Sequence, residues 1–412
     1  MTRRVVITGL GTVNPLSSGV KEFWHALCAG RNGISFIEQI DTSAFKVKIG
    51  GEVKNFEPET VLNSKLVRHL DRFAQFALVA SISAVKDSGV DFSREDPYRC
   101  GTIIGSGIGG LCEFEEQHAR FIHGGPGKIS PFVIPKMIPN AAPGNISIHF
   151  GLCGPNTAVS TACASAAHAI QDATRAIQYG QADIMIAGGS ESVMTNMGLG
   201  GFISARALSQ RNDNPQSASR PFDRDRDGFV LAEGAGVLVL EDLEHARRRD
   251  APIYAEVLGC GSTADAHHIT APHPEGNGAS KAMEIAIKDA RLNPEDIQYV
   301  NAHGTSTPLG DEAETKAIKR VFGQHARKIA VSSTKSMIGH TLGASGGIEL
   351  LVCALSIRHS VVHPTTNYYA PDPACDLDYV PNTAREMRVR RAISNSFGFG
   401  GHNCCLAIGA LN

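Results

Sequence analysis

The amino-acid sequence predicts an α/β fold with largely parallel sheets, built from one unit that occurs twice. Short apolar runs alternate with alanine-rich helical stretches along the whole chain, which is typical of β-α-β units. At roughly 150 residues per domain, 412 residues are too many for one ordinary core. Two strand-to-helix junctions, near residues 163 and 345, both lead into runs of small residues and therefore indicate a duplication.

The individual elements follow from these runs. Runs of strand length occur at residues 4–9, 99–104, 156–161, 184–188, 237–241, 254–261, 299–302, 329–332, 391–395 and 404–409. Apolar residues recur at helical spacing in residues 165–179 and 280–290. The first strand follows two arginines, as a signal peptide would, but glycines interrupt it too early, so we expect a buried strand. The duplication predicts an N-terminal half at residues 1–250 and a C-terminal half at residues 251–412.

Composition excludes several classes of protein. Hydrophobic residues make up 42% of the chain and charged residues 19%, which is enough apolar material for a large core and rules out a disordered chain. The net charge of −2 gives no electrostatic basis for binding nucleic acid or a membrane surface. The ten cysteines contain no C-x-x-C pair and no metal-ligand spacing, so we expect reduced thiols and no metal. Without a targeting segment we expect a cytoplasmic protein of bacterial type, although a processed organellar enzyme would have the same features.

Cys163 is the first candidate for a catalytic residue. It ends a β-branched strand and begins an alanine-rich helix, so its thiol would lie at the positive end of a helix dipole. That position favours the thiolate and predicts a lowered pKa. The free amides of the first helical turn could also bind a developing oxyanion. The alternative is a small apolar residue in a tight corner, which is the commoner situation for a single cysteine.

Two histidine elements in the second half strengthen the catalytic interpretation. His303 lies in the segment Asn-Ala-His-Gly-Thr-Ser-Thr at residues 301–307, and His340 ends the segment Lys-Ser-Met-Ile-Gly-His at residues 335–340. Both elements follow a predicted strand, and ligand crevices in parallel α/β sheets open at the carboxyl ends of strands. We therefore expect Cys163, His303 and His340 to converge on one site.

Other suggestive patterns are weaker. Residues 395–403 predict a glycine-rich loop that carries two apolar phenylalanine side chains. The loop lacks the lysine and the following helix of a phosphate-binding loop. The glycines at residues 105–110 resemble a dinucleotide fingerprint that lacks an acidic residue at the required offset. His359 and His363 are four residues apart beside a strand and a proline, so a helical zinc pair is not expected.

Together these motifs resemble the signature blocks of the β-ketoacyl-acyl-carrier-protein synthases. The four blocks are residues 161–163, 303–307, 335–340 and 395–403, and the resemblance extends over essentially the whole chain. It is closest to the synthase II branch, which residues 211–215 and 226–229 also match; His402 departs from it, because threonine is common there. The resemblance implies a thiolase-like fold, with duplicated βαβαβαββ halves in a five-layered αβαβα arrangement, and a homodimer.

The reaction implied by the resemblance is the decarboxylating Claisen condensation of fatty acid biosynthesis. Cys163 would accept an acyl group from acyl carrier protein as a thioester. Malonyl-carrier protein would then lose carbon dioxide, and its carbanion would attack that thioester to give a 3-oxoacyl product two carbons longer. No metal or other cofactor is implied.

The same resemblance assigns roles to individual residues. The amides of Cys163 and Phe399 would hold the oxyanion, and Phe399 would also gate the malonyl site. His303 and His340 would stabilise the enolate as neutral donors, and Lys335 would orient and tune His340. The implied substrate-binding residues are Thr305 and Thr307 on the pantetheine arm, Ile108 and Phe202 along the acyl tunnel, and Glu314 and Asp311, which would buttress the loop around Lys335 and His303.

The implied partner is an acidic acyl carrier protein. Because the net charge is −2, attraction must come from a local basic patch, for which Lys65, Arg68, Arg206 and Lys128 match the family's positions. Two other functions stay open: a non-catalytic chain-length partner, which characteristically lacks the nucleophile, and a cysteine thioester hydrolase, which needs a water-activating base. Cys163, His303 and His340 are all present and favour the synthase.

Overall fold

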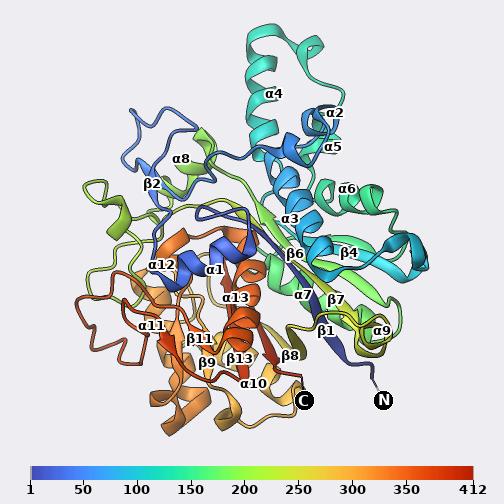
Figure 1. Ribbon diagram of the computed structural model, residues 1–412. Helices are drawn as coiled ribbons and strands as arrows, with labels where there is room; N and C mark the ends of the chain where they lie inside the picture. The colour runs from blue at the N-terminus through green and yellow to red at the C-terminus, as the bar shows by residue number, and fades with distance from the viewer. Residues whose placement is uncertain (1, 412) are drawn as a thin grey trace.

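Ten strands form one sheet in the structure, a computed structural model that describes residues 2–411 (Figure 1). Their order across the sheet is β10-β9-β13-β14-β8-β1-β7-β6-β4-β5. The bounds are β1 Val5–Val13, β4 Cys100–Gly105, β5 Asn156–Val159, β6 Ile184–Glu191, β7 Gly234–Asp242, β8 Ala255–Ala264, β9 Tyr299–Asn301, β10 Ala330–Ser332, β13 Arg391–Gly398 and β14 His402–Gly409. Each of the ten predicted runs overlaps one of these strands, so the strand predictions are confirmed.

The prediction of largely parallel sheets is wrong. The strands at each end of the sheet are parallel, namely β10-β9-β13 and β5-β4-β6, but the pairings between β13 and β6 are all antiparallel. A physical reason is visible at β13 and β14, which are joined by residues 399–401 alone. So short a turn can only return the chain antiparallel to itself. Alternating strand and helix signals do not record strand direction.

The two halves repeat one strand order. Each half contributes five strands, which can be numbered from first to fifth along the chain. From the outer edge of the sheet inward, the order in both halves is third, second, fourth, fifth, first. The halves meet where β1 pairs with β8 over Val5–Ile7 only. This repeated topology is what a duplication produces. The predicted boundary near residue 250 falls between α9 (Leu243–Arg248) and β8, and as a domain boundary it stays a prediction.

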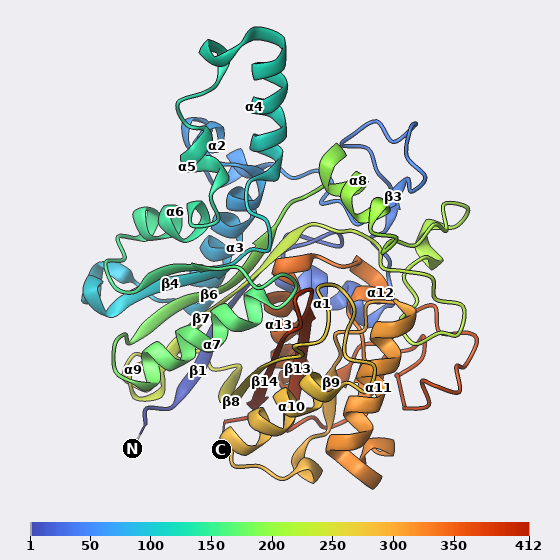
Figure 2. The same cartoon turned by 180° about the vertical axis from the view of Figure 1, so that it is seen from behind.

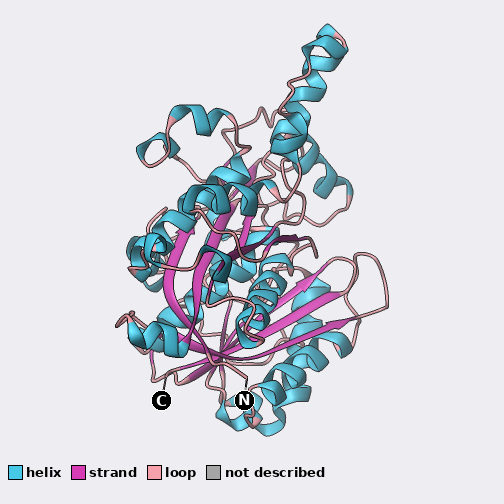
Figure 3. Cartoon of the chain, turned by 90° about the vertical axis from the view of Figure 1, so that its right-hand side faces the viewer, coloured by secondary structure: helices cyan, strands magenta, loops and turns pink. Residues whose placement is uncertain are grey.

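The two halves of the sheet and three sets of helices make five layers (Figure 3). The outer face of the first half is covered by α3 (Arg72–Ser88) and α6 (Ala141–Phe150), and that of the second half by α10 (Asn277–Asp289) and α11 (Pro308–Phe322). Between the halves lie α7 (Ser165–Gln178) and α13 (Ser345–His359). These two helices touch because Gly346 has no side chain: a Cβ there would lie 2.9 Å from the Ala167 nitrogen.

The remaining helices are short or peripheral. They are α1 Val20–Cys28, α2 Ser64–Arg68, α4 Leu111–Gly124, α5 Val133–Met137, α8 Asn196–Ser204 and α12 Lys335–Ile338, and two small pairs of strands join β2 Ser35–Phe36 with β3 Ile49–Gly50 and β11 Val361–Val362 with β12 Arg385–Glu386. Helix α4 projects from the first half and forms the tip of the molecule in Figures 1 and 2. Phe114, Phe121 and Ile122 on α4 are exposed. Within residues 2–411, no helix has the length and apolar character needed to cross a membrane.

Candidate active site

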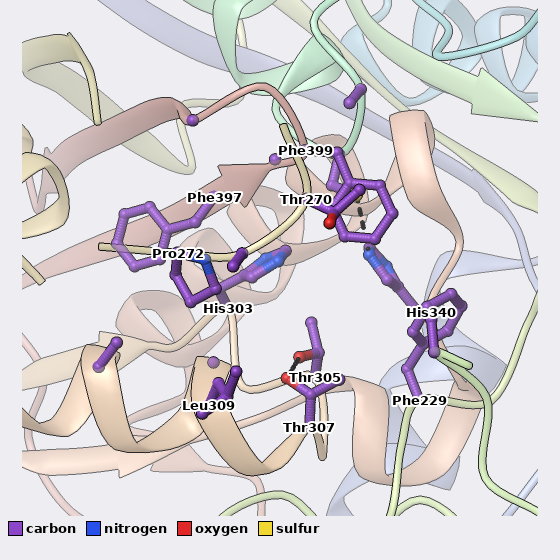
Figure 4. A pocket seen from close by; sticks show the side chains of 18 of the residues that line it. Phe229, Thr270, Pro272, His303, Thr305, Thr307, Leu309, His340, Phe397 and Phe399 are labelled. Carbon is purple, nitrogen blue, oxygen red and sulfur yellow. Dashed lines mark hydrogen bonds between the residues drawn. The ribbon is translucent and has the colours of Figure 1, made fainter. Parts of the chain in front are cut away.

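The predicted catalytic side chains converge on one cavity. Cys163 lies at the turn between β5 and α7, His303 follows β9, His340 follows α12, and Phe399 lies in the β13–β14 turn. All four line a cavity of about 610 Å³. In Figure 4 the imidazoles of His303 and His340 point into the same space, with the Thr305 and Thr307 hydroxyls opposite.

Some of the predicted site residues line the cavity and others do not. Those that line it are Cys163, His303, His340, Phe399, Thr305, Thr307, Ile108, Phe202, Glu314 and Arg206. Lys335 and Asp311 are buried behind its wall, whereas Lys65, Arg68 and Lys128 lie on the exposed surface away from it. The chain thus brings together residues from both halves.

The turn that carries Cys163 is strained and tightly held. Ala162, just before it, has a φ of 50°, a left-handed conformation that non-glycine residues adopt at a cost. The Ser165 hydroxyl holds the turn by donating to the Ala162 carbonyl at 2.6 Å while it accepts the Thr161 amide at 2.9 Å. A Cβ at Gly398 would lie 3.0 Å from the Cys163 nitrogen, so only glycine lets the Phe399 amide approach the thiol.

The pKa of Cys163 is raised, and the prediction of a lowered pKa is wrong. Cys163 is only 8% exposed, and burial raises its pKa to about 12 because a thiolate loses its hydration in the cavity. The Lys335 charge and hydrogen bonds from the Phe399 and Cys163 amides pull the pKa downward but do not outweigh burial. Both amides therefore act on the sulfur, and their predicted use as an oxyanion hole stays a prediction.

His340 is a neutral imidazole with its proton on the side of the cavity. Its Nδ1 accepts the Leu342 amide at 3.2 Å, so Nδ1 carries no proton. The proton is therefore on Nε2, which lies 3.1 Å from the Cys163 sulfur. Burial lowers the pKa of His340 well below the usual histidine value, which keeps the ring neutral. The Phe229 ring packs against this imidazole edge to face.

Lys335 contacts His303 rather than His340, so the predicted role of Lys335 in orienting His340 is wrong. Its Nζ lies 3.4 Å from Nδ1 of His303, and it also contacts the Glu349 carboxylate. An ammonium can only donate, so Nδ1 of His303 accepts and Nε2 keeps the proton. The physical reason is the route of the chain: α12 leaves β10 beside β9, and His303 follows β9. At His340, Lys335 acts through its charge alone, which helps lower the pKa of the imidazole.

The two predicted buttressing carboxylates act on different segments. Glu314 accepts the His303 and Gly304 amides at 2.9 and 2.8 Å, and therefore fixes the start of the histidine loop. Asp311 accepts the Ser306 amide at 3.1 Å and the Phe222 amide at 2.7 Å. Burial raises the pKa of Asp311 to about 7. Neither carboxylate contacts Lys335 through a hydrogen bond.

Sequence reasoning missed two buried glutamates. Glu349 is the partner of Lys335, and burial raises its pKa to about 7. Glu191 accepts the amides of Gly107, Ile108 and Gly343 at 2.7, 3.2 and 3.0 Å, and so ties the Ile108 loop to the second half. The available signal was the same in both cases, because each is a single acid in an otherwise apolar run.

The first comparison with known proteins concerns the family. Residues 2–246 match the N-terminal domain of beta-ketoacyl synthase, and residues 254–369 match its C-terminal domain. These matches span most of the chain, so the chain belongs to the β-ketoacyl synthase family. The predictions of a condensing enzyme and of a thiolase-like fold are confirmed.

Two similar proteins of known name belong to one branch of this family, the synthase II branch. A Staphylococcus aureus (strain COL) protein named 3-oxoacyl-[acyl-carrier-protein] synthase 2 is 51% identical over 404 residues, which is 98% of this chain and 97% of the relative. A protein of the same name from Coxiella burnetii (strain RSA 493 / Nine Mile phase I) is 50% identical over 406 residues, 98% of each chain. The predicted resemblance to the synthase II branch is therefore confirmed.

Solved structures agree with the fold. A beta-ketoacyl synthase from Burkholderia phymatum STM815 superposes with a TM-score of 0.92 at 36% identity, covering 100% of both chains. A type II polyketide ketosynthase solved with its acyl-carrier protein reaches a TM-score of 0.94 at 37% identity, again covering 100% of both chains.

Proposed function

We propose that this chain catalyses the decarboxylating condensation of an acyl group on Cys163 with malonyl-acyl-carrier protein. The observation that carries the proposal is the pair of neutral imidazoles in the Cys163 cavity, both protonated on Nε2. Two N–H donors beside a thiol suit the stabilisation of an enolate oxygen. They do not suit the activation of water, for which a hydrolase needs an unprotonated nitrogen facing the cavity.

The first half-reaction loads the enzyme. The Cys163 sulfur attacks the carbonyl carbon of the acyl thioester, and the carbonyl oxygen becomes an oxyanion held by the Cys163 and Phe399 amides. The intermediate collapses, the carrier sulfur leaves, and the proton of the Cys163 thiol ends on the carrier thiol. Because burial keeps the Cys163 thiol protonated, this proton must leave as the bond to carbon forms.

The second half-reaction uses the two histidines. The bond between the malonyl carboxylate and C2 breaks, carbon dioxide leaves, and the electron pair forms an enolate whose oxygen accepts from the Nε2 protons of His303 and His340. The C2 carbon then attacks the acyl thioester and expels Cys163 as a thiolate, giving a 3-oxoacyl product, and the thiolate takes up a proton from solvent to restore the thiol. Lys335 holds the donor orientation of His303 through the contact at Nδ1.

Thr305 and Thr307 are proposed to bind the pantetheine arm of the carrier. Their hydroxyl oxygens lie 3.0 Å apart on the wall of the cavity below the two histidines (Figure 4). A hydroxyl both donates and accepts, so this pair suits the alternating amide groups of pantetheine. Phe399, also on the cavity wall, is proposed to separate the malonyl site from the acyl-enzyme.

The proposed partner is an acyl carrier protein that docks on Lys65, Arg68, Lys128 and Arg206. All four side chains are exposed, and Arg206 also lines the cavity. The solved type II polyketide ketosynthase with its acyl-carrier protein supports a partner of this kind.

A homodimer in the cytoplasm is also proposed. β5 is an edge strand with exposed Asn156 and Thr157, and an unpaired edge can pair with a second copy. Size-exclusion chromatography with light scattering tests the dimer, which a monomer at micromolar concentration would contradict.

Mass spectrometry after incubation with acyl-carrier substrate tests the proposed function. A stable acyl adduct at Cys163, converted to a 3-oxoacyl product when malonyl-carrier protein is added, is the expected result. Rapid release of free acid would instead identify a hydrolase. The absence of any adduct on folded protein would identify a non-catalytic chain-length partner.

A further inference from the structure

A buried hydrogen-bond network lies behind the loops that carry His303 and Lys335, and its side chains do not line the cavity. At its centre is His363, which follows β11 and is fully buried. Its Nε2 lies 3.1 Å from the Thr334 hydroxyl and 3.3 Å from the hydroxyls of Tyr299 and Ser332. Three hydroxyls around one ring nitrogen form a specific arrangement that packing alone does not require.

The proton positions in this network are determined by its ends. Nδ1 of His363 lies 2.9 Å from the Pro364 carbonyl, which can only accept, so Nδ1 carries the proton and Nε2 accepts. The side-chain amide of Asn301 donates through Nδ2 to the Thr334 hydroxyl oxygen at 3.1 Å. Because Nε2 of His363 can only accept, the Thr334 hydroxyl, at 3.1 Å the nearest of the three, donates to it.

The network lies next to His303 and to Lys335, which contacts His303. Thr334 immediately precedes Lys335, and Asn301 is two residues before His303. Further along the same segment, Thr365 accepts the Ser333 amide at 3.1 Å, so the chain that carries His363 is bonded to the turn that carries Lys335. The contact between Lys335 and His303 therefore spans two loops whose bases are joined by the Asn301–Thr334 hydrogen bond.

We propose that His363 is a positioning residue for decarboxylation: by accepting the Thr334 hydroxyl proton it holds the Asn301–Thr334 bridge, and so keeps Lys335 in place against Nδ1 of His303. The inference rests on the proposed assignment of decarboxylation to His303. The acylated residue, Cys163, has separate supports, since the Ser165 hydroxyl holds its turn. His363 therefore affects one half-reaction and not the other.

Three variants and two assays test this role. His363→Leu keeps bulk but removes the acceptor, His363→Gln restores an acceptor, and Val362→Ala removes buried packing from the neighbouring residue without touching the network. Carbon dioxide release from malonyl-carrier protein gives kcat and KM for decarboxylation, and mass spectrometry gives the rate of Cys163 acylation. His303→Ala is measured alongside as the reference.

The expected result is a split between the half-reactions. In His363→Leu the decarboxylation kcat falls about tenfold, because small misplacements of a catalytic group are costly, while its KM and the acylation rate stay near wild type. His363→Gln recovers most of the loss, and Val362→Ala leaves the ratio of the two rates unchanged. If His363→Leu does not fold, Thr334→Val removes the donor with little change of volume and is expected to give the same split.

Other results overturn the role. A loss shared equally by both half-reactions in His363→Leu, or wild-type decarboxylation in that folded variant, would show that His363 only packs. Full decarboxylation in His303→Ala would remove the assignment on which the inference rests. Loss in His303→Ala without loss in His363→Leu would overturn the role of His363 alone.

Discussion

The two halves of this protein share a topology but use the same junction differently. In the first half the chain passes from β5 into α7 through a short turn that holds Cys163. In the second half it passes from β10 into α13 through an added segment, α12 and a 3-10 helix at Leu342–Ala344, which brings Lys335 and His340. The repeated scaffold places both junctions at one cavity, and the added segment makes their chemistry different.

Burial acts on the two sides in opposite directions and leaves both neutral. It raises the pKa of the Cys163 thiol and lowers the pKa of the two imidazoles, so each group keeps its uncharged form. The comparison suggests a division of labour in which the first half supplies a nucleophile and the second supplies hydrogen-bond donors. Each half can be tested by removing its own reactive group.

Cys163→Ala gives the largest expected effect. Condensation is lost completely because no thioester can form, whereas malonyl decarboxylation continues because His303, His340 and Lys335 remain. Product formation and carbon dioxide release are measured on the same preparation. If this variant is folded and loses both activities, the two halves do not divide the reaction.

His303→Ala tests the other side of the comparison. Removing one hydrogen-bond donor from a developing oxyanion costs about 10²–10³ in rate, so decarboxylation falls by that factor while acylation of Cys163 partly survives. His340→Ala gives a similar loss of decarboxylation. The exposed His25 on α1 provides a control, and His25→Ala is expected to behave as wild type. Acylation and decarboxylation that fall together in His303→Ala would count against the division.

The two sides also respond differently to pH. Because the pKa of Cys163 is raised to about 12, its thiolate fraction increases about tenfold per pH unit between pH 7 and 10. Alkylation of Cys163 by iodoacetamide should follow that slope without a plateau. Decarboxylation should stay flat from pH 8 down to about pH 6, since both imidazoles are neutral well below the usual histidine pKa. A fall in decarboxylation centred near pH 6.5 would show that one imidazole is solvated.

The sequence predicted the scaffold better than the electrostatics of the site. Most strands were found because buried strands are apolar runs that need only local information; the exposed edge strand β5 is the exception. Strand direction, the pKa of Cys163 and the partner of Lys335 depend on segments far apart in the chain. The helix dipole at Cys163 was correctly placed, but the competing effect, burial under the Phe399 turn, has no local signal. Glu349 was visible only as an acid in an apolar helix.

Reversal of the basic patch affects carrier-bound substrates. Lys65→Glu with Arg68→Glu should raise the KM for carrier substrates about tenfold and remove much of its salt dependence, because exposed charges steer association. Short pantetheine thioesters should react at the wild-type rate. Lys281→Glu, an exposed charge reversal on α10, is the matched control. Equal losses with both kinds of substrate would indicate a folding defect rather than a docking site.

Ile108→Phe gives the smallest expected effect, counted for each methylene group of the acyl substrate. Ile108 lines the cavity and is 41% exposed, while its amide is held by Glu191, so the side chain can change without moving the loop. Each methylene that the larger ring keeps out of the tunnel loses about 0.8 kcal/mol of burial, or about fourfold in kcat/KM. Turnover should therefore fall stepwise for long acyl substrates and stay unchanged for short ones, with Ile108→Val as the conservative control. A proportional loss at every length would make Ile108 a packing residue, and acyl length would then have to be selected elsewhere along the cavity.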